Sequence, residues 1–342
     1  MELDKKRLEV LKEVVKEYIE TGEPVSSEKV AKGVSFPISS ATVRNYMAEL
    51  SDLGYLTQQH ISSGRIPTSK GFRFYVEEAL KERKHIKPSN IEIPEIDTFS
   101  NLREMLAQIS DLISNYTNEI SLVVSPCIEE DKLRYIHFFI ASEFLYTVIV
   151  STIQTTEAIP LLKSNLTMEQ VIYLENFLNE KLKNLAILEA SKIIVEKNFF
   201  SDELNRDLVV VVFKFYGKLK EEQYKRKTQE IFIRGISNLL TTQIEIAEER
   251  LKFLFNMLER KETINKVLVE LEQGEKLQII IGDENKIPEL WDYSLITVKY
   301  TIKELEGTLG LLGPIRMNYV RGILVLEEIA NKLEKMAEKL LG

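Results

Sequence analysis

The chain has 342 residues, of which 44% are hydrophobic and 29% charged, and its formal net charge is −8 at pH 7. This composition excludes a disordered chain, and the length predicts two or three domains. The single cysteine excludes a disulfide framework or a thiolate zinc site within one chain, and the three histidines stand far apart in the sequence. We therefore expect no catalytic site, cofactor or metal, in a soluble, cytoplasmic protein that does not enter a membrane.

Charge is unevenly distributed along the chain. Residues 1–87 contain 15 Lys and Arg against 13 Asp and Glu, and the rest contains 30 against 40, so the balance is +2 in the first part and −10 in the second. No acidic residue occurs between Leu53 and Val76, although two arginines and a lysine do. A local basic face on an acidic molecule is typical of a site-specific DNA-binding protein, because the overall negative charge limits non-specific trapping on DNA.

The first part of the chain predicts three helices, over 4–20, 26–31 and about 40–53. Gly and Pro signals end the first helix, and a serine begins the second. Ser39 or Ser40 caps the third helix, which a glycine closes.

The residues after the third helix predict a two-stranded hairpin over 55–68, with its tip near Ser63 and Gly64. A glycine at the tip would let the hairpin approach the sugar-phosphate backbone of DNA. Three helices followed by a hairpin is the order of a winged helix-turn-helix domain. A further helix is expected from Gly71, followed by a linker over 84–94.

The remaining chain predicts an α+β fold interrupted by a helical segment. Helices are expected over 102–117, about 168–220, 244–272 and 317–341, and strands over 120–124, 135–141, 146–153, 230–238, 277–282 and 295–300. The glycines of 307–314 are expected to form turns before the last helix, because the residue order of a phosphate-binding loop is missing.

The third helix carries the residues expected to contact base edges. In a helix-turn-helix the first turns of the recognition helix enter the major groove, where small polar residues, arginine and asparagine can bond to bases. Thr42, Arg44 and Asn45 lie off the apolar stripe that includes Val43 and Met47, so they can face DNA. An ordinary capped surface helix is the alternative for these residues taken alone.

The hairpin and the residues after it are expected to contact phosphates. Arg65 and Lys70 can neutralise phosphate charge, and Thr68 or Ser69 can donate hydrogen bonds. For His60, a role in holding the loop explains the residue as well as DNA contact does. The candidate DNA-binding residues are Ser39, Ser40, Thr42, Arg44, Asn45, His60, Ser63, Arg65, Thr68, Lys70 and Arg73.

Several motifs follow one another in a fixed order. Ala-Thr-Val-Arg-Asn, Leu-Gly-Tyr-Leu, Ser-Gly-Arg-Ile-Pro-Thr and Gly-Phe-Arg-Phe-Tyr-Val occur within 39–76. Later come Gly-Ile-Ser-Asn-Leu-Leu at 235–240, Ile-Gly-Asp-Glu-Asn at 281–285, Gly-Thr-Leu-Gly at 307–310 and Gly-Pro-Ile-Arg-Met-Asn-Tyr at 313–319. Together these motifs closely resemble those of the heat-inducible transcription repressor family HrcA.

The resemblance implies an α+β multidomain architecture with an N-terminal winged helix-turn-helix and a GAF-like α+β domain interrupted by an inserted, largely helical dimerisation domain. The implied boundaries are 1–87 for the winged-helix domain, 88–98 for a linker, 99–154 and 226–342 for the GAF-like domain, and 155–225 for the insertion. It also implies negative regulation of heat-shock chaperone operons by a homodimer bound to an inverted repeat in double-stranded DNA, with activity coupled to the availability of a GroEL-type chaperonin.

Three other functions are alternatives to the repression of chaperone operons. A repressor of the biotin-ligase type would need a Gly/Arg-rich nucleotide loop, and the sequence shows none. A metabolic repressor that responds to a small molecule stays open, because GAF-like folds often bind ligands. A purely structural interaction protein would leave the basic, acid-free segment without a purpose.

Overall fold

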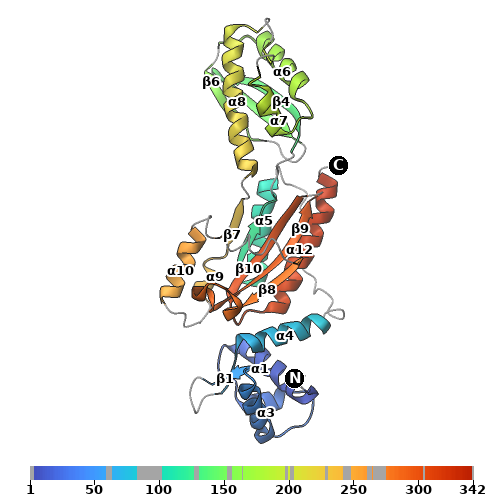
Figure 1. Ribbon diagram of the computed structural model, residues 1–342, viewed down its shortest axis with the longest axis vertical. Helices are drawn as coiled ribbons and strands as arrows, with labels where there is room; N and C mark the ends of the chain where they lie inside the picture. Colours follow the sequence, from blue (N-terminus) through green and yellow to red (C-terminus); the bar gives the residue numbers. More distant parts are fainter. Residues whose placement is uncertain are drawn as a thin grey trace.

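The structure is a computed structural model, and it describes residues 4–58, 64–82, 102–126, 131–151, 156–163, 165–196, 199–200, 204–227, 230–241, 248–259, 264, 275–302 and 305–340. Three parts follow one another along the long axis of the molecule (Figure 1). We call them the head (4–82), the body (102–126 and 230–340) and the inserted unit (131–227). The predicted hairpin tip, with His60 and Ser63, and the predicted linker lie outside the described residues.

The head consists of helices and a short antiparallel ladder, in the order expected from the sequence. Its elements are α1 (Lys5–Thr21), α2 (Ser27–Gly33), α3 (Ser40–Asp52), β1 (Leu56–Thr57), β2 (Ile66–Pro67) and α4 (Ser69–Glu82). Polar side chains cap the first three helices: Asp4, Ser26 and Ser39 each accept a hydrogen bond from a backbone N–H in the first turn. Gly22, with φ of 74°, ends α1 in the left-handed conformation that glycine adopts without strain.

The core of the head forms where α1 and α3 turn their apolar stripes inward. Leu11 and Val15 of α1 and Val43 and Leu50 of α3 belong to one apolar cluster and are fully buried. Their helical spacing places them on one side of each helix, so the opposite side of α3 stays in contact with solvent.

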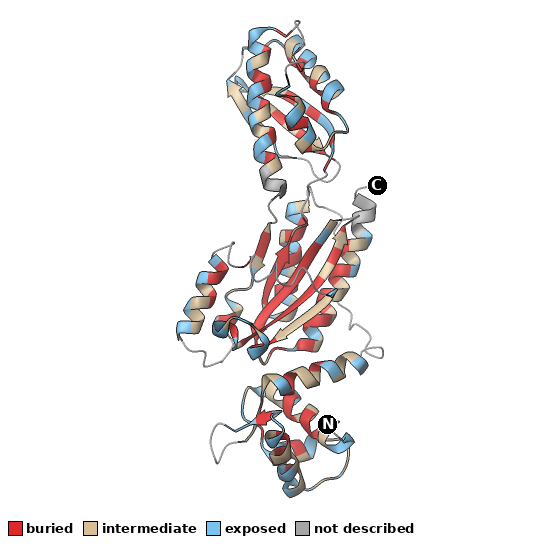
Figure 2. Ribbon diagram, viewed as in Figure 1, coloured by how far each residue is buried: buried red, intermediate tan, exposed pale blue. Residues whose placement is uncertain are grey.

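The body is built on a five-stranded antiparallel sheet with the strand order β7-β3-β10-β9-β8. The strands are β3 (Ile120–Val124), β7 (Ile231–Arg234), β8 (Leu277–Ile281), β9 (Tyr293–Ile302) and β10 (Leu305–Pro314). Helices α5 (Leu102–Thr117) and α12 (Tyr319–Leu340) cover one face, and α10 (Glu248–Glu259) packs on the other. Figure 2 shows the central strands buried almost throughout.

The body also contains three short elements. They are α9 (Asn238–Thr241) and the 3-10 turns η2 (Gly282–Glu284) and η3 (Pro288–Leu290). The strand predicted over 230–238 is therefore shorter than expected and gives way to a helix. Of the helix predicted over 244–272, the continuous described part is α10.

The prediction of turns at 307–314 was wrong, because these residues form β10, a central strand of the sheet. Its glycines serve close packing. A Cβ atom at Gly307 would lie 2.3 Å from the ring of Tyr300, and one at Gly313 would lie 2.3 Å from the carboxylate of Glu119. A glycine-rich strand and a glycine-rich turn look alike in sequence, and only the neighbouring side chains distinguish them.

The inserted unit has its own three-stranded sheet, β4 (Leu133–Ala141), β5 (Phe144–Ser151) and β6 (Ile159–Lys163), and the helices α6 (Met168–Leu182), α7 (Ile187–Ile193) and α8 (Arg206–Lys227). The predicted boundary at 155 was wrong. Strand β5 pairs with β4 on one side and with β6 on the other, and the three strands bury apolar residues in a separate core with the helices. The insertion therefore begins near 131 and is an α+β unit rather than a largely helical one.

Candidate nucleic-acid interface

The first turn of α3 is fixed by two hydroxyl groups. Ser39 Oγ accepts a hydrogen bond from the backbone N–H of Thr42 at 3.1 Å, and the Ser39 and Thr42 hydroxyl oxygens are 2.8 Å apart. This pair caps the helix at the end of the molecule opposite the inserted unit (Figure 1). Ser39 and Thr42, which are both candidate DNA-binding residues, therefore also fix the geometry of the first turn of α3.

Four residues form an exposed face on the N-terminal half of α3, which we call the α3 face. They are Ser40, Ala41, Arg44 and Asn45, and all four are exposed. Across the part of the chain that the structure describes, no hydrogen bond or ion pair engages the side chain of Arg44 or Asn45. Such side chains can donate hydrogen bonds to an external partner without first breaking an internal contact.

The electrostatics of α3 favour an anionic partner at its first half. Both acidic residues of the helix, Glu49 and Asp52, lie in its second half. Glu49 is paired with Arg7 of α1, whose Nε lies 2.5 Å from the carboxylate. The hydrogen bond to Glu49 raises the pKa of Arg7 above its usual value. No carboxylate of α3 therefore competes at the α3 face, where the helix N-terminus itself favours negative charge.

Arg65, a predicted phosphate ligand, lies against the far end of α3. Its guanidinium Nη1 donates to Ser51 Oγ at 2.5 Å. Its backbone forms an antiparallel bridge with Val25. A Cβ atom at Gly64 would lie 2.4 Å from the Val25 carbonyl oxygen, so this glycine is required for close approach to the backbone of the head itself.

Thr68 and Lys70 hold the connection between α3 and α4. The Thr68 hydroxyl donates to the Gly54 carbonyl oxygen at 2.7 Å, and Lys70 Nζ donates to the Leu53 carbonyl oxygen at 2.8 Å. Lys70 Nζ also lies 4.5 Å from the ring centroid of Tyr55. A cation at the C-terminus of α3 complements the carbonyl groups that the helix leaves unpaired.

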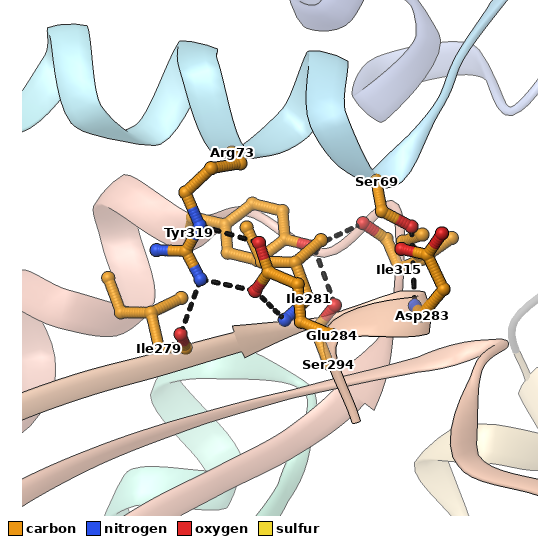
Figure 3. Close-up of polar contacts among 9 residues, drawn as sticks. All are labelled: Ser69, Arg73, Ile279, Ile281, Asp283, Glu284, Ser294, Ile315 and Tyr319. Carbon is orange, nitrogen blue, oxygen red and sulfur yellow. Dashed lines mark hydrogen bonds and ion pairs between the residues drawn. The ribbon is translucent and has the colours of Figure 1, made fainter. Parts of the chain in front are cut away.

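Arg73 lies at the contact between head and body (Figure 3), on α4, which lies between α3 and the body (Figure 1). Its Nε donates to one carboxylate oxygen of Glu284 at 2.7 Å, and Nη2 donates to the other and, at 2.5 Å, to the Ile279 carbonyl oxygen. The bond to Glu284 raises the pKa of Arg73 above its usual value. Sequence reasoning missed Glu284 as a partner, although the motif at 281–285 contains it.

A small apolar pocket lies between α10 and the sheet of the body. Leu122, Met257 and Tyr293 are among its lining residues. Within the described ranges, the buried hydroxyl of Tyr293 has no hydrogen-bond partner. Burial, together with the nearby Asp292, raises the pKa of Tyr293 to about 12. An unsatisfied hydroxyl in an apolar pocket is the feature that a small polar molecule or a water would complete.

The described residues contain neither a membrane-spanning helix nor a metal-binding cluster. None of the described helices is both long enough and apolar enough to span a bilayer. Equally, the described side chains include no cluster of three or more His, Cys, Asp or Glu suited to a metal ion.

Comparison with known proteins gives matches over the whole chain. The family model described as the HrcA protein C terminal domain matches residues 103–323. The heat-inducible transcription repressor HrcA of Acetivibrio thermocellus is 31% identical over 348 residues, which cover 100% of this chain and 98% of that protein. The protein of the same name from Halalkalibacterium halodurans is 30% identical, with 98% of this chain and 97% of that protein covered.

A solved structure shows the same fold. The crystal structure of a protein described as hypothetical matches with a TM-score of 0.77 at 26% sequence identity, and 99% of each chain is covered. The class is therefore that of a mixed α+β protein whose fold is shared over its full length with a solved structure. The chain belongs to the HrcA family, which confirms the resemblance drawn from its sequence motifs.

Proposed function

We propose that this chain represses transcription of heat-shock chaperone operons by binding an inverted-repeat operator as a homodimer. The head would act as a winged helix-turn-helix, and the body as a GAF-like domain. The observation that carries the proposal is the α3 face, where Arg44 and Asn45 extend without a described partner from a serine-capped helix. The names of the relatives, heat-inducible transcription repressors, support the same function.

The chemistry of the α3 face suits base edges in the major groove. Arginine donates two hydrogen bonds to guanine, and asparagine pairs with adenine through its amide. Arg44 and Asn45 are adjacent, and Ser40 and Ala41 lie one turn before them on the same side, which leaves room for close approach. We propose Arg44 and Asn45 as the base contacts and Ser39, Ser40 and Thr42 as contacts to the adjoining backbone.

The remaining candidate residues divide into two groups. Arg65, Thr68 and Lys70 flank the C-terminal end of α3, and we propose that they meet phosphates there together with His60 and Ser63 of the hairpin. Their hydrogen bonds within the head would then orient them in advance. Arg73 is not part of this proposal, because Glu284 and the Ile279 carbonyl already bind its guanidinium.

A direct test of DNA binding uses two double-stranded fragments. One carries the dyad-symmetric region upstream of the chaperonin operon of the source organism, and the other carries the same bases in scrambled order. We expect binding to the dyad at least ~10³-fold tighter than to the scrambled duplex, as is usual for specific complexes at physiological salt. Equal affinity for the two fragments would refute the proposed function.

The inserted unit is the proposed site of dimerisation. Of the ten exposed large hydrophobic residues recorded among the described residues, eight lie in this unit. They are Tyr135, Phe144, Met168, Ile172, Tyr173, Val195, Val210 and Phe213. A concentration of exposed apolar side chains marks a surface that a partner covers.

Aromatic contacts connect this surface across two helices. Rings of Tyr173 and Phe177 on α6 continue through Phe199 and Phe200 to Phe213 on α8, with neighbouring centroids 5.4 to 6.5 Å apart. A second copy of the chain is the occupant that an inverted-repeat operator requires. We expect Phe213→Glu to yield a monomer in sedimentation velocity and to weaken operator binding, whereas an unchanged dimer would place the contact elsewhere.

Coupling to a GroEL-type chaperonin is the part of the proposal that the family resemblance supports. Addition of the chaperonin should increase the fraction of repressor that binds the operator in a titration. A chemically unfolded client protein, added in excess, should reverse this gain because it competes for the chaperonin. If neither addition changes the fraction of bound repressor, the proposed coupling to the chaperonin is refuted. The proposal of operator binding would still stand.

A further inference from the structure

Head and body share one apolar core at their contact. Phe72 of α4 is fully buried between two rings, with its centroid 6.2 Å from that of Tyr18 on α1 and 5.8 Å from that of Tyr319 on α12. All three rings belong to the cluster that also contains the core of the head and one face of the body sheet. A domain tethered only by a flexible linker would not bury aromatic residues in this way.

The turn η2 is shaped to receive α4. Gly282 has φ of 54°, and a Cβ atom there would lie 2.4 Å from Ser69 Oγ. The next backbone N–H, that of Asp283, donates to the same Ser69 oxygen at 3.3 Å. Both the backbone conformation and the closeness of α4 therefore require glycine at this position.

The ion pair of Arg73 and Glu284 fixes an orientation as well as a distance. Two parallel hydrogen bonds join the guanidinium to the carboxylate, and the Ile279 carbonyl accepts a third (Figure 3). The carboxylate is itself held, because Glu284 Oε2 accepts from the Ile281 backbone N–H at 2.8 Å. A planar, bidentate pair resists rotation in a way that a single point contact does not.

A second approach between body and head involves α1. Arg316 of the body reaches the C-terminus of α1, where a Cβ atom at Gly22 would be 2.8 Å from its Nη1. The carbonyl end of a helix attracts a cation. Contacts at α1 and at α4 therefore hold the head at two separate points, and α3 is carried rigidly with it.

We infer that Arg73 and Glu284 are positioning residues that fix the direction of α3 relative to the body and thereby set the spacing of the two half-sites. The inference rests on the proposed function, since it needs two heads on one DNA duplex. In a symmetric dimer the bodies define where each head begins, and the ion pair defines where each recognition helix points.

The helical geometry of DNA makes this inference measurable. One turn contains about 10.5 base pairs, so two extra base pairs between half-sites rotate one half-site by about 70° relative to the other. A head held at two points cannot follow this rotation without breaking a contact. A head without the Glu284 contact is held by fewer groups and should follow this rotation at a smaller cost.

The experiment compares Glu284→Gln with the wild type on operator variants whose spacer is shortened or lengthened by two base pairs. The control is Glu230→Gln, because Glu230 binds Arg103 Nε at 2.9 Å entirely within the body. For the wild type and the control we expect at least ~30-fold weaker binding to the altered spacers, and for Glu284→Gln less than ~5-fold. The double variant Arg73→Glu with Glu284→Arg should restore part of the steep dependence.

A measurement without DNA accompanies this test. A dye on Lys32→Cys, in a Cys127→Ser background, reports the tumbling of the head by time-resolved anisotropy. We expect slow tumbling with the whole molecule in the wild type and in Glu230→Gln, and an added faster phase in Glu284→Gln. Absence of the faster phase in Glu284→Gln would overturn the positioning role.

The outcomes separate the two ideas. A wild type that prefers the dyad, together with a Glu284→Gln variant that keeps the steep spacer dependence, would overturn the positioning role and leave the proposed function standing. A wild type without any preference for the dyad would overturn the proposed function, and the inference on half-site spacing with it.

Discussion

Arg44 and Arg73 occupy opposite surroundings, although both stand in a basic, acid-poor part of the sequence and both were candidates for DNA contact. Arg44 is exposed on α3, and none of the described side chains pairs with it. Arg73, on α4, is bound by Glu284 and by the Ile279 carbonyl. The first surface is ready for an external partner, whereas the second already has its partner inside the molecule.

Local charge in the sequence therefore does not identify a nucleic-acid contact. The carboxylate that neutralises Arg73 comes from more than 200 residues further along the chain, at Glu284. An arginine whose guanidinium is already bound by a carboxylate in both of its parallel positions is not available to DNA. The α3 face and the contact between Arg73 and Glu284 can therefore be tested separately.

The largest expected effect belongs to the shared core of head and body. Phe72→Ala should lower the free energy of unfolding by about 3–5 kcal/mol, because it removes a fully buried ring between Tyr18 and Tyr319. Scanning calorimetry measures this loss. Leu53→Ala, which shortens an exposed side chain of the head, is the control and should change stability little. Similar losses for the two variants would contradict the role of Phe72 in joining head and body.

The next effect concerns the α3 face. Arg44→Ala should weaken binding to the specific operator by about 1–3 kcal/mol and leave the melting temperature unchanged, because its side chain supports no described contact. Titrations against the operator and against scrambled DNA measure both affinities. An equal loss on the two DNAs would show that Arg44 contacts only phosphate.

The body also contains a half-buried carboxyl group whose ionisation should oppose folding. Burial raises the pKa of Glu119 to about 8, and the nearby Arg316 lowers it only in part. The pKa of Glu119 in the unfolded chain is near 4.5, so the folded state binds more protons than the unfolded state between pH 4.5 and 8. The free energy of unfolding therefore falls as pH rises through this range.

Glu119→Gln removes this pH dependence. At pH 9 the variant should be more stable than the wild type by about 1–2 kcal/mol, a part of the maximum that the shift allows, and at pH 4.5 the two should be similar. Melting temperatures across this range, with the exposed Glu20→Gln as control, measure the effect. A constant difference between variant and wild type at every pH would refute it.

The smallest effect is expected at Lys70, which lies between the two surfaces. If Lys70 meets a phosphate from its place at the end of α3, Lys70→Ala should reduce the slope of log affinity against log salt by about one contact. The affinity on operator and scrambled DNA should fall by the same factor. An unchanged slope would show that Lys70 contacts only the C-terminus of α3 and the Tyr55 ring, and no phosphate.

The sequence was sufficient where the signal was local. Serines at 26 and 39 cap helices because their hydroxyls reach backbone donors three residues on, and the apolar stripe of α3 places Arg44 and Asn45 outside. The order of helices and strands in the head follows from such local patterns. The sequence alone is therefore enough to predict the candidate residues on α3.

The sequence was insufficient where a residue depends on a distant neighbour. Alternating residues at 135–141 and 146–153 predicted strands, but the pattern does not state which sheet they join, and they belong to the inserted unit. The glycines of β10 resemble a turn until Tyr300 and Glu119 are seen to fill the space beside them.

Local patterns in the amino-acid sequence were enough to predict the helices of the head, the serine caps, the exposed side of α3 and the family. Only the folded molecule shows that Arg73 faces Glu284, that Phe72 joins two domains, and that the insertion begins near residue 131. The physical reason is range: capping and periodicity act over three or four residues, whereas ion pairs, ring contacts and strand pairing join groups that the chain brings together only when it folds.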